Sequence, residues 1–159
     1  KGYKSAGVNR LSIGVQSFDD VKLHQLGRVH SSNEARAAIT AAQNAGFDRI
    51  NIDLMYGLPG QTIAQALTDL SAALAFDTGH ISWYQLTIEP NTVFYSQPPI
   101  LPDDDYTADI ADAGERLLHE RGYQRYEVSA YAKPQQQCLH NLNYWQFGDY
   151  YGMKEGCYS

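Results

Sequence analysis

The segment RINIDLMYG, residues 49–57, is the most informative part of this sequence for the class of fold. Its side chains alternate in kind, with Ile50, Ile52 and Leu54 on one side and Asn51, Asp53 and Met55 on the other. A repeat of two residues is typical of a β-strand with one aliphatic face and one more polar face. We therefore predict a strand here, followed by a turn in the sequence GLPGQT.

Three more segments predict strands, namely RLSIGVQ (10–16), ISWYQLTI (81–88) and YQRYEVSAYA (123–132). The segments between them have helical features. A short helix is expected from Asp19 to Gln25 and a second one after SSNE, where Ser31 and Glu34 have the spacing of a capping box. Leucines at helical spacing predict a third helix over 62–75. The acidic start at Asp103 opens a fourth, which reaches Arg121.

Regular alternation of strands and helices predicts an α/β fold, with parallel strands joined by right-handed crossovers. The predicted units would fill part of a (β/α) barrel or part of an open doubly wound sheet, and the pattern alone favours neither. The proline-rich loop EPNTVFYSQPPILP (89–102) is long for a simple connection and is a candidate functional or packing insert.

Composition excludes several classes of protein. The 159 residues are 43% hydrophobic and carry a net charge of -6, so a surface for duplex nucleic acid is not expected. No run of about 18 apolar residues is present to span a bilayer, and we expect a cytoplasmic location. Cys138 and Cys157 are too far apart for a CxxC metal site. The chain starts KGYKSAGVNR, without an initiator methionine, and we expect a piece of a longer protein.

Polar side chains come near the carboxyl ends of the predicted strands, where ligands gather in both candidate architectures. They are Gln16 on the first strand, Asp53 on the second, and Gln85 and Thr87 on the third, with Arg28 in the connection after the first. An amide, a carboxylate, a hydroxyl and a guanidinium suit a zwitterionic, nucleoside-like ligand. Alternatively, Asp53 caps a loop and Gln16 satisfies backbone groups at a strand end.

The segment HNLNYW (140–145) allows two interpretations. In the first, it is a helix whose Leu142, Tyr144 and Trp145 pack on the sheet while His140 caps or hydrogen-bonds. In the second, His140 is a metal or heme ligand beside aromatic rings that stack on a flat macrocycle. The other histidines stand alone in sequence and are expected at the surface, namely His24, His30, His80 and His119.

Several segments together resemble one family, the HemW-type radical SAM heme chaperones related to oxygen-independent coproporphyrinogen III oxidase. They are GVNRLSIGVQSFDD, LGRVH, INIDLMYGLPGQT, WYQLTIEPNT, LPDDD, GYQRYEVSAYAKP and CLHNLNYWQFGDY. The resemblance extends to about residue 152 and implies a partial (β/α) barrel of the radical SAM type. It divides the chain into a barrel part, 1–132, and a segment after the barrel, 133–159, that begins a missing C-terminal region.

The resemblance also implies cofactors. Gln16, Arg28, Asp53 and Thr87 fall on positions that contact S-adenosylmethionine in the superfamily. Radical chemistry there needs a [4Fe–4S] cluster on a CxxxCxxC loop. This sequence has no such loop, which in the family lies upstream of the part that this chain matches.

The motif HNxxYW resembles a signature of the chaperone branch and implies that His140 contacts heme, with Asn141, Tyr144 and Trp145 lining the site. The tail after Gly152 departs from the family pattern. The implied function is a heme carrier that passes heme to an unidentified acceptor protein, with membrane-associated proteins among the candidates. The alternative is a coproporphyrinogen III oxidase that decarboxylates propionates through a 5'-deoxyadenosyl radical. We assign no catalytic residue in the chain.

Overall fold

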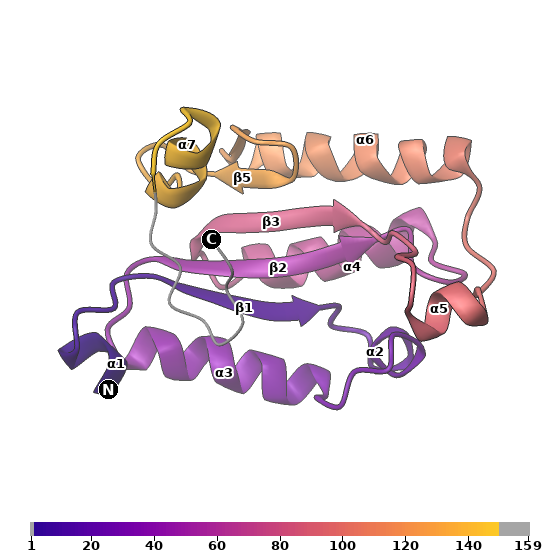
Figure 1. Cartoon of the computed structure of the whole chain (residues 1–159), viewed down its shortest axis with the longest axis horizontal. Coiled ribbons are helices and arrows are strands. Elements are labelled where there is room, and N and C mark those ends of the chain that lie inside the picture. The colour runs from indigo at the N-terminus through magenta and orange to yellow at the C-terminus, as the bar shows by residue number, and fades with distance from the viewer. Residues whose placement is uncertain (1, 150–159) are drawn as a thin grey trace.

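The computed structural model describes residues 2–149 (Figure 1). Its centre is a five-stranded sheet with the order β1-β2-β3-β5-β4. The strands are β1 (Leu11–Gln16), β2 (Ile50–Tyr56), β3 (Gly79–Gln85), β4 (Gln124–Arg125) and β5 (Ala130–Ala132). The first three are parallel to one another, as the alternating pattern predicts.

Long helices connect the parallel strands and cover one face of the sheet. The helices are α1 (Gly2–Ser5), α2 (Asp20–Gln25), α3 (Ser32–Asn44), α4 (Ile63–Leu74), α5 (Val93–Ser96), α6 (Asp104–Glu120) and α7 (Leu139–Trp145). The main core lies between α3, α4 and α6 and the aliphatic side of the strands, where Ile52, Leu54 and Ile81 are fully buried. Their burial is the main favourable contribution to the stability of this fold.

The predicted helix starts are confirmed at atomic detail. Ser31 and Glu34 form a reciprocal capping box at the start of α3, and Thr62 and Gln65 form another at the start of α4. Asp19 accepts hydrogen bonds at the start of α2, and Asp103 does so at the start of α6. Each cap satisfies backbone N–H groups that have no partner within the helix.

The fourth predicted strand is wrong in its pairing. Residues 123–132 form two short strands, and β5 returns antiparallel between β3 and β4. The polarity of the two halves explains this arrangement. The sequence AYA of β5 is completely buried and lies beside β3, whereas the exposed Gln124 and Arg125 of β4 form the edge. An apolar strand gains more free energy than a polar one from a central position.

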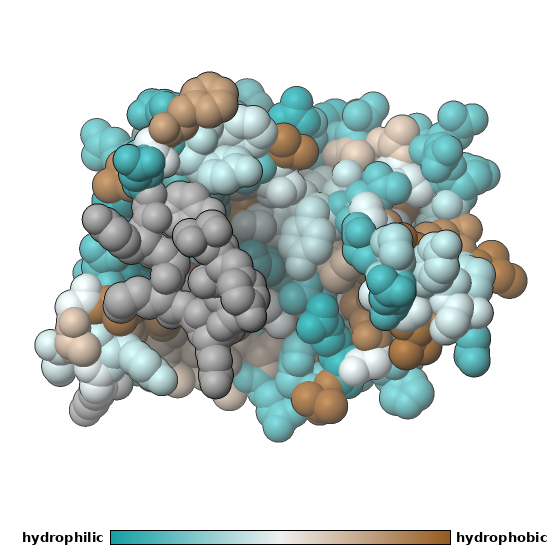
Figure 2. Space-filling view, viewed as in Figure 1, coloured by the Kyte–Doolittle hydropathy of each residue, from teal (hydrophilic) through white to brown (hydrophobic). Residues whose placement is uncertain are grey.

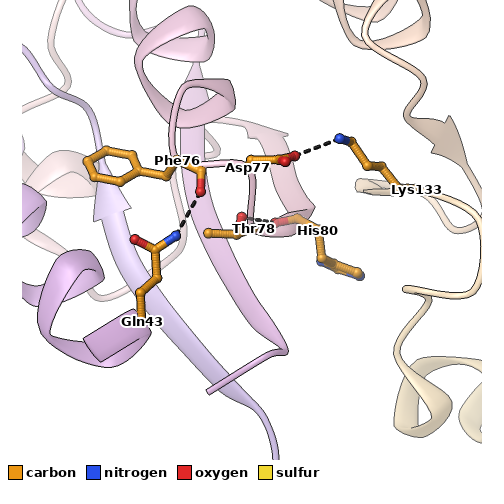
Figure 3. A network of polar contacts seen from close by, with 6 residues as sticks. All are labelled: Gln43, Phe76, Asp77, Thr78, His80 and Lys133. Atoms are coloured by element: carbon orange, nitrogen blue, oxygen red, sulfur yellow. Dashed lines mark hydrogen bonds and ion pairs between the residues drawn. The ribbon is translucent and has the colours of Figure 1, made fainter. Parts of the chain in front are cut away.

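The third strand is displaced from its prediction, because it begins at Gly79 rather than at residue 81 and ends at Gln85 rather than at residue 88. Its start is anchored from two neighbouring segments (Figure 3). Gln43 Nε2 of α3 donates to the carbonyl of Phe76 at 2.7 Å, and Lys133 Nζ donates to Asp77 Oδ1 at 2.6 Å. The connection that precedes His80 is therefore held on both sides.

The sheet does not close. Within residues 2–149, β1 and β4 each pair with a single neighbour, and the arrangement is part of a barrel. The loop 89–102 contains the single turn α5 and packs Phe94 and Leu101 against Met55, Leu58 and Leu86. None of the described helices is long and apolar enough to cross a membrane.

Candidate functional site

The face of the sheet opposite the helices is lined by polar side chains. We call it the polar face and define it by Ser12, Asn51, Asp53, His80, Ser82 and Tyr84. These residues come from β1, β2 and β3, because side chains two positions apart on one strand share a face. The alternation that predicted the strands therefore also collects the polar groups.

Gln16 lies at the carboxyl end of β1 in an unusual backbone conformation. Its φ is 69°, in the left-handed region, and the pairing of β1 with β2 is irregular between Gly14 and Gln16. The side chain folds back over Gly14, where a Cβ atom would lie 2.8 Å from Gln16 Nε2. The hydroxyl of Tyr84 donates to Gln16 Oε1 at 2.7 Å. The amide is thus held on the polar face and is 6% exposed.

Asp53 lies beside this amide, because Gly14 and Asp53 are partners across the two strands. Ser12 Oγ donates to one carboxylate oxygen at 2.9 Å, and Asn51 Nδ2 donates to the other at 2.7 Å. Burial raises the pKa of Tyr84, and the nearby charge of Asp53 raises it further while that of Arg28 lowers it. The tyrosine therefore lies within electrostatic range of both charged groups.

Arg28 and Thr87 line a cleft of about 540 Å³ at the carboxyl ends of the strands. Met55, two residues beyond Asp53 on the same face of β2, and Leu86 form apolar parts of its wall. Thr87 Oγ1 donates to Glu89 at 3.0 Å. Hydrophobic side chains are exposed at this end of the molecule, where α2 and α5 lie (Figure 2). Gln16 and Asp53 are not part of the wall of this cleft.

The segment that carries Arg28 is fixed by contacts of α2. Gly27 has a φ of 68°, which ends the helix, and the backbone N–H of Arg28 donates to Leu23 O at 3.0 Å. The buried Lys22 Nζ donates to the carbonyl of Pro59 at 2.6 Å. The segment GLPGQT, which was predicted to be a turn, thus contacts α2 through the carbonyl of Pro59.

His80 is buried, so its predicted surface position is wrong. It is 3% exposed and contacts Asn51 through Nδ1 at 2.7 Å and Tyr126 through Nε2 at 2.6 Å. Burial lowers the pKa of His80 to about 3, with a smaller contribution from the charge of Arg10. The imidazole is therefore neutral at physiological pH. The sequence of β3 did indicate that His80 belongs to the polar face, since His80, Ser82 and Tyr84 alternate with buried apolar residues.

The HNxxYW motif forms α7 at the amino ends of the parallel strands, opposite to the end where α2 and α5 lie (Figure 1). Asn141 Nδ2 donates to the Tyr126 hydroxyl at 3.1 Å. Tyr144 and Trp145 are 60% and 53% exposed, with ring centroids 6.1 Å apart, so neither is buried against the sheet as the packing interpretation required. His140 is also exposed. Cys157 and the divergent tail lie outside the described residues.

A second hollow of the polar face connects α7 with Asp53. Its wall includes Arg10, Asp53, His80, Cys138 and Asn141. Arg10 Nη1 donates to the carbonyl of Gln136 at 3.4 Å, while the buried Nη2 atom has no hydrogen-bond partner among residues 2–149. Asp53 therefore lies on the polar face between the two groups of predicted residues, with Gln16, Arg28 and Thr87 on one side and the α7 motif on the other.

Comparison with known proteins identifies the class of protein. Residues 1–73 match the family model described as Radical SAM superfamily. The fold is similar to that of coproporphyrinogen III oxidase (HemN) from Escherichia coli, with a TM-score of 0.74, 27% identity, and coverage of 83% of this chain and 31% of that one. It is also similar to Elp3 of Methanocaldococcus infernus, with a TM-score of 0.63 and 18% identity over 71% of this chain and 28% of that one. Residues 1–73 therefore match the radical SAM superfamily, and the sheet has part of the radical SAM fold.

Within the superfamily, the chain is a homologue of the HemW heme chaperones. It is 57% identical to heme chaperone HemW of Escherichia coli (strain K12) over 98% of its own length and 40% of that protein. It is 38% identical to the protein of the same name from Bacillus subtilis, again over 98% of the chain, and 42% of the relative. The chain thus spans about 40% of the length of the curated relatives that it matches.

Proposed function

We propose that the protein binds S-adenosylmethionine at the carboxyl ends of its parallel strands and heme at α7, and that it delivers heme to an acceptor protein. The observation that carries the first part is the joint placement of Gln16 and Asp53 on the polar face, beside the cleft lined by Arg28 and Thr87. The second part is supported by the names of the relatives, which are heme chaperones.

The residues present suit S-adenosylmethionine, which combines an amino-acid head group, a sulfonium and an adenosine. Arg28 is exposed and forms no ion pair within the described chain, so its guanidinium is available for a ligand carboxylate. The Asp53 carboxylate can accept hydrogen bonds from ribose hydroxyls. Gln16 offers a fixed amide beside it, and Thr87 lies near the place proposed for the adenosine.

The residues of this chain do not supply a [4Fe–4S] site. The sequence holds two cysteines, and residues 2–149 contain no group of three His, Cys, Asp or Glu side chains arranged for a metal. We propose that the cluster ligands lie upstream, as in the family. When bound, such a cluster supplies the electron that cleaves S-adenosylmethionine in the superfamily. The side chains of this chain then hold and orient the substrate of that cleavage.

The α7 motif suits a flat hydrophobic macrocycle. The exposed side chains in and beside it include Leu139, Tyr144, Trp145 and Phe147, a local concentration of apolar surface. An imidazole such as that of His140 is a usual axial ligand of heme iron. Tyr144 and Trp145 would stack on the porphyrin, and Asn141 would line the site from the side that faces the sheet.

The organisation of the protein follows from the same proposal. Residues 1–132 would form the partial barrel, without its cluster-binding part, and residues 133–159 would begin the region that holds heme. The acceptor is a heme-binding protein, and a membrane-associated acceptor is compatible with this scheme. We also propose a cytoplasmic location for this carrier.

The proposal is tested by titrating heme into the full-length protein and its His140→Ala variant. Coordination by His140 predicts a Soret band that the variant loses, while the affinity for S-adenosylmethionine, measured by calorimetry, stays the same. A His119→Ala variant is the matched control, because His119 is exposed on α6 and lies outside the motif. Equal Soret bands in all three proteins would exclude His140 as the ligand.

The alternative function is oxidative decarboxylation of coproporphyrinogen III, which the structural likeness to the Escherichia coli oxidase favours. An oxidase does not need an axial ligand for iron. Turnover of coproporphyrinogen by the full-length protein with a reconstituted cluster, unaffected by His140→Ala, would establish the oxidase. Heme binding without such turnover would establish the carrier.

A further inference from the structure

A continuous chain of hydrogen bonds crosses the polar face from α7 to Asp53. It starts at Asn141, whose side-chain amide donates to the Tyr126 hydroxyl, and continues from Tyr126 to His80. From His80 it passes to Asn51, and from Asn51 to the Asp53 carboxylate. Every contact in the chain is between 2.6 and 3.1 Å long. The chain thereby joins two groups of residues that lie far apart in sequence.

The donors and acceptors of this chain are fixed by its end at Asp53. A carboxylate only accepts, so the nitrogen of the Asn51 side chain faces Asp53 and its oxygen faces His80. His80 Nδ1 must then carry the hydrogen. Because the pKa of His80 is lowered to about 3 by burial, the ring is neutral and Nε2 is an acceptor. Tyr126 therefore donates to His80, and every hydrogen bond points toward Asp53.

At its other end the chain determines where α7 begins. Cys138 is the N-cap residue of α7, and its side chain forms no capping hydrogen bond. The hydroxyl of Tyr126 accepts instead from the backbone N–H of Cys138 at 3.1 Å and from Asn141. Tyr126 thus takes over the role of a cap from a distant part of the sequence. The two lone pairs and the hydrogen of its hydroxyl are all used.

We propose that Tyr126 and His80 are positioning residues that fix the α7 motif and the Asp53 carboxylate relative to each other. The inference rests on the proposed function, because it assigns one ligand to each end of the chain. Neither residue needs to touch a ligand. Loss of His80 should weaken the hold on the Asn51 amide, which Ser12 and Ser82 also contact, and thereby loosen Asp53. Loss of the Tyr126 hydroxyl should free His80 Nε2 and also remove the acceptor at the start of α7.

The first test is Tyr126→Phe in the full-length protein, which removes the hydroxyl and keeps the ring. We expect the affinities for both S-adenosylmethionine and heme to fall by about three- to tenfold, the size of the effect of one hydrogen bond. Tyr56→Phe is the matched control, because Tyr56 packs on Trp83 on the covered face and its hydroxyl has no hydrogen-bond partner in the described chain. Unchanged affinities in Tyr126→Phe would overturn the proposal.

A second test separates positioning from a general loss of structure. In an Asp53→Asn background, Tyr126→Phe should cause no further loss of S-adenosylmethionine affinity, since its effect passes through Asp53. If the losses in affinity are additive, Tyr126 does not act through Asp53 and the proposed coupling is contradicted. His80→Gln offers an uncharged donor and acceptor and should preserve both affinities better than His80→Leu. Equal losses in the two His80 variants would also count against the proposal.

These outcomes are distinct from failure of the proposed function. If the wild-type full-length protein binds neither S-adenosylmethionine nor heme, the proposed function fails and the inference fails with it. If it binds both ligands and Tyr126→Phe leaves both affinities unchanged at an unaltered unfolding temperature, only the inference fails.

Discussion

At the level of single residues, side chains on the polar face are held in one orientation by their neighbours. Gln16 occupies a left-handed conformation and Gly14 leaves room for its amide, so the side chain can reach Tyr84. A residue with a Cβ atom at position 14 would displace that amide. The conformation of Gln16 is unfavourable for a non-glycine residue and is maintained here by the surrounding contacts.

The hydrogen bond from Tyr84 to Gln16 gives a first prediction. Tyr84→Phe removes the donor to Gln16 Oε1 and should weaken binding of S-adenosylmethionine about fivefold, the effect of one net hydrogen bond. Calorimetric titration of the full-length protein measures this change, with Tyr56→Phe as the control. An unaltered affinity would show that the ligand does not depend on the orientation of Gln16.

His80 gives a prediction for pH dependence. Its folded pKa of about 3 lies below the value of 6.5 expected in the unfolded chain, so the unfolded state binds the extra proton between these values. Stability due to His80 is therefore present at neutral pH and is lost as the pH falls below 6.5. Between pH 7 and pH 5 we expect the free energy of unfolding to fall by about 2 kcal/mol more in the wild type than in His80→Gln. Urea unfolding at both pH values measures the difference, and parallel losses would refute it.

At the scale of elements, local sequence sets where helices start, and packing sets how strands pair. The capping box of Ser31 and Glu34 was evident in sequence because it depends on residues three positions apart, and the structure adds a second box of the same spacing at Thr62 and Gln65. The pairing of β5 depends instead on competition for the place beside β3. β5 takes this place because its side chains are apolar and become buried there, whereas β4 is exposed. The alternation within residues 123–132 does not show which half of the segment will lie beside β3.

Helix α6 packs closely on the sheet at Gly114. A Cβ atom added there would collide with the ring of Trp83, a rigid side chain that is itself buried. Although alanine normally stabilises a helix relative to glycine, we expect Gly114→Ala to lower the free energy of unfolding by about 1–3 kcal/mol. Chemical denaturation measures the change. The loss should shrink in a Trp83→Leu background, and a stabilised Gly114→Ala protein would disprove this close contact.

At the scale of the whole molecule, the residues proposed for the two ligands lie toward opposite ends of the parallel strands (Figure 1). Arg28 and Thr87 line the cleft at the carboxyl ends, and α7 lies at the amino ends. Asp53, on the polar face between them, is joined to α7 by the Tyr126–His80–Asn51 chain. The two proposed sites therefore lie at different ends of the sheet, and the series of hydrogen bonds connects the residues around them.

Because the two proposed sites are far apart, removing a direct contact at one site should not affect binding at the other. Arg28→Ala in the full-length protein should weaken binding of S-adenosylmethionine, because the guanidinium is the proposed partner of its carboxylate, and should leave the heme Soret titration unchanged. Arg121→Ala is the control for removing an exposed arginine at the end of α6. A parallel loss of heme affinity in Arg28→Ala would indicate that the two ligands share one site.

Sequence patterns alone were enough to predict an α/β fold, the starts of α2, α3, α4 and α6, and the strand face that carries Gln16 and Asp53. These features follow from spacings of two to four residues, over which backbone geometry alone relates one side chain to another. The antiparallel return of β5, the burial of His80 and the hydrogen-bonded connection between Asp53 and α7 through Tyr126 depend on how the chain packs in three dimensions. His80, for example, contacts Asn51, 29 positions before it, and Tyr126, 46 positions after it. Such contacts form because buried polar groups must find partners wherever the folded chain brings them.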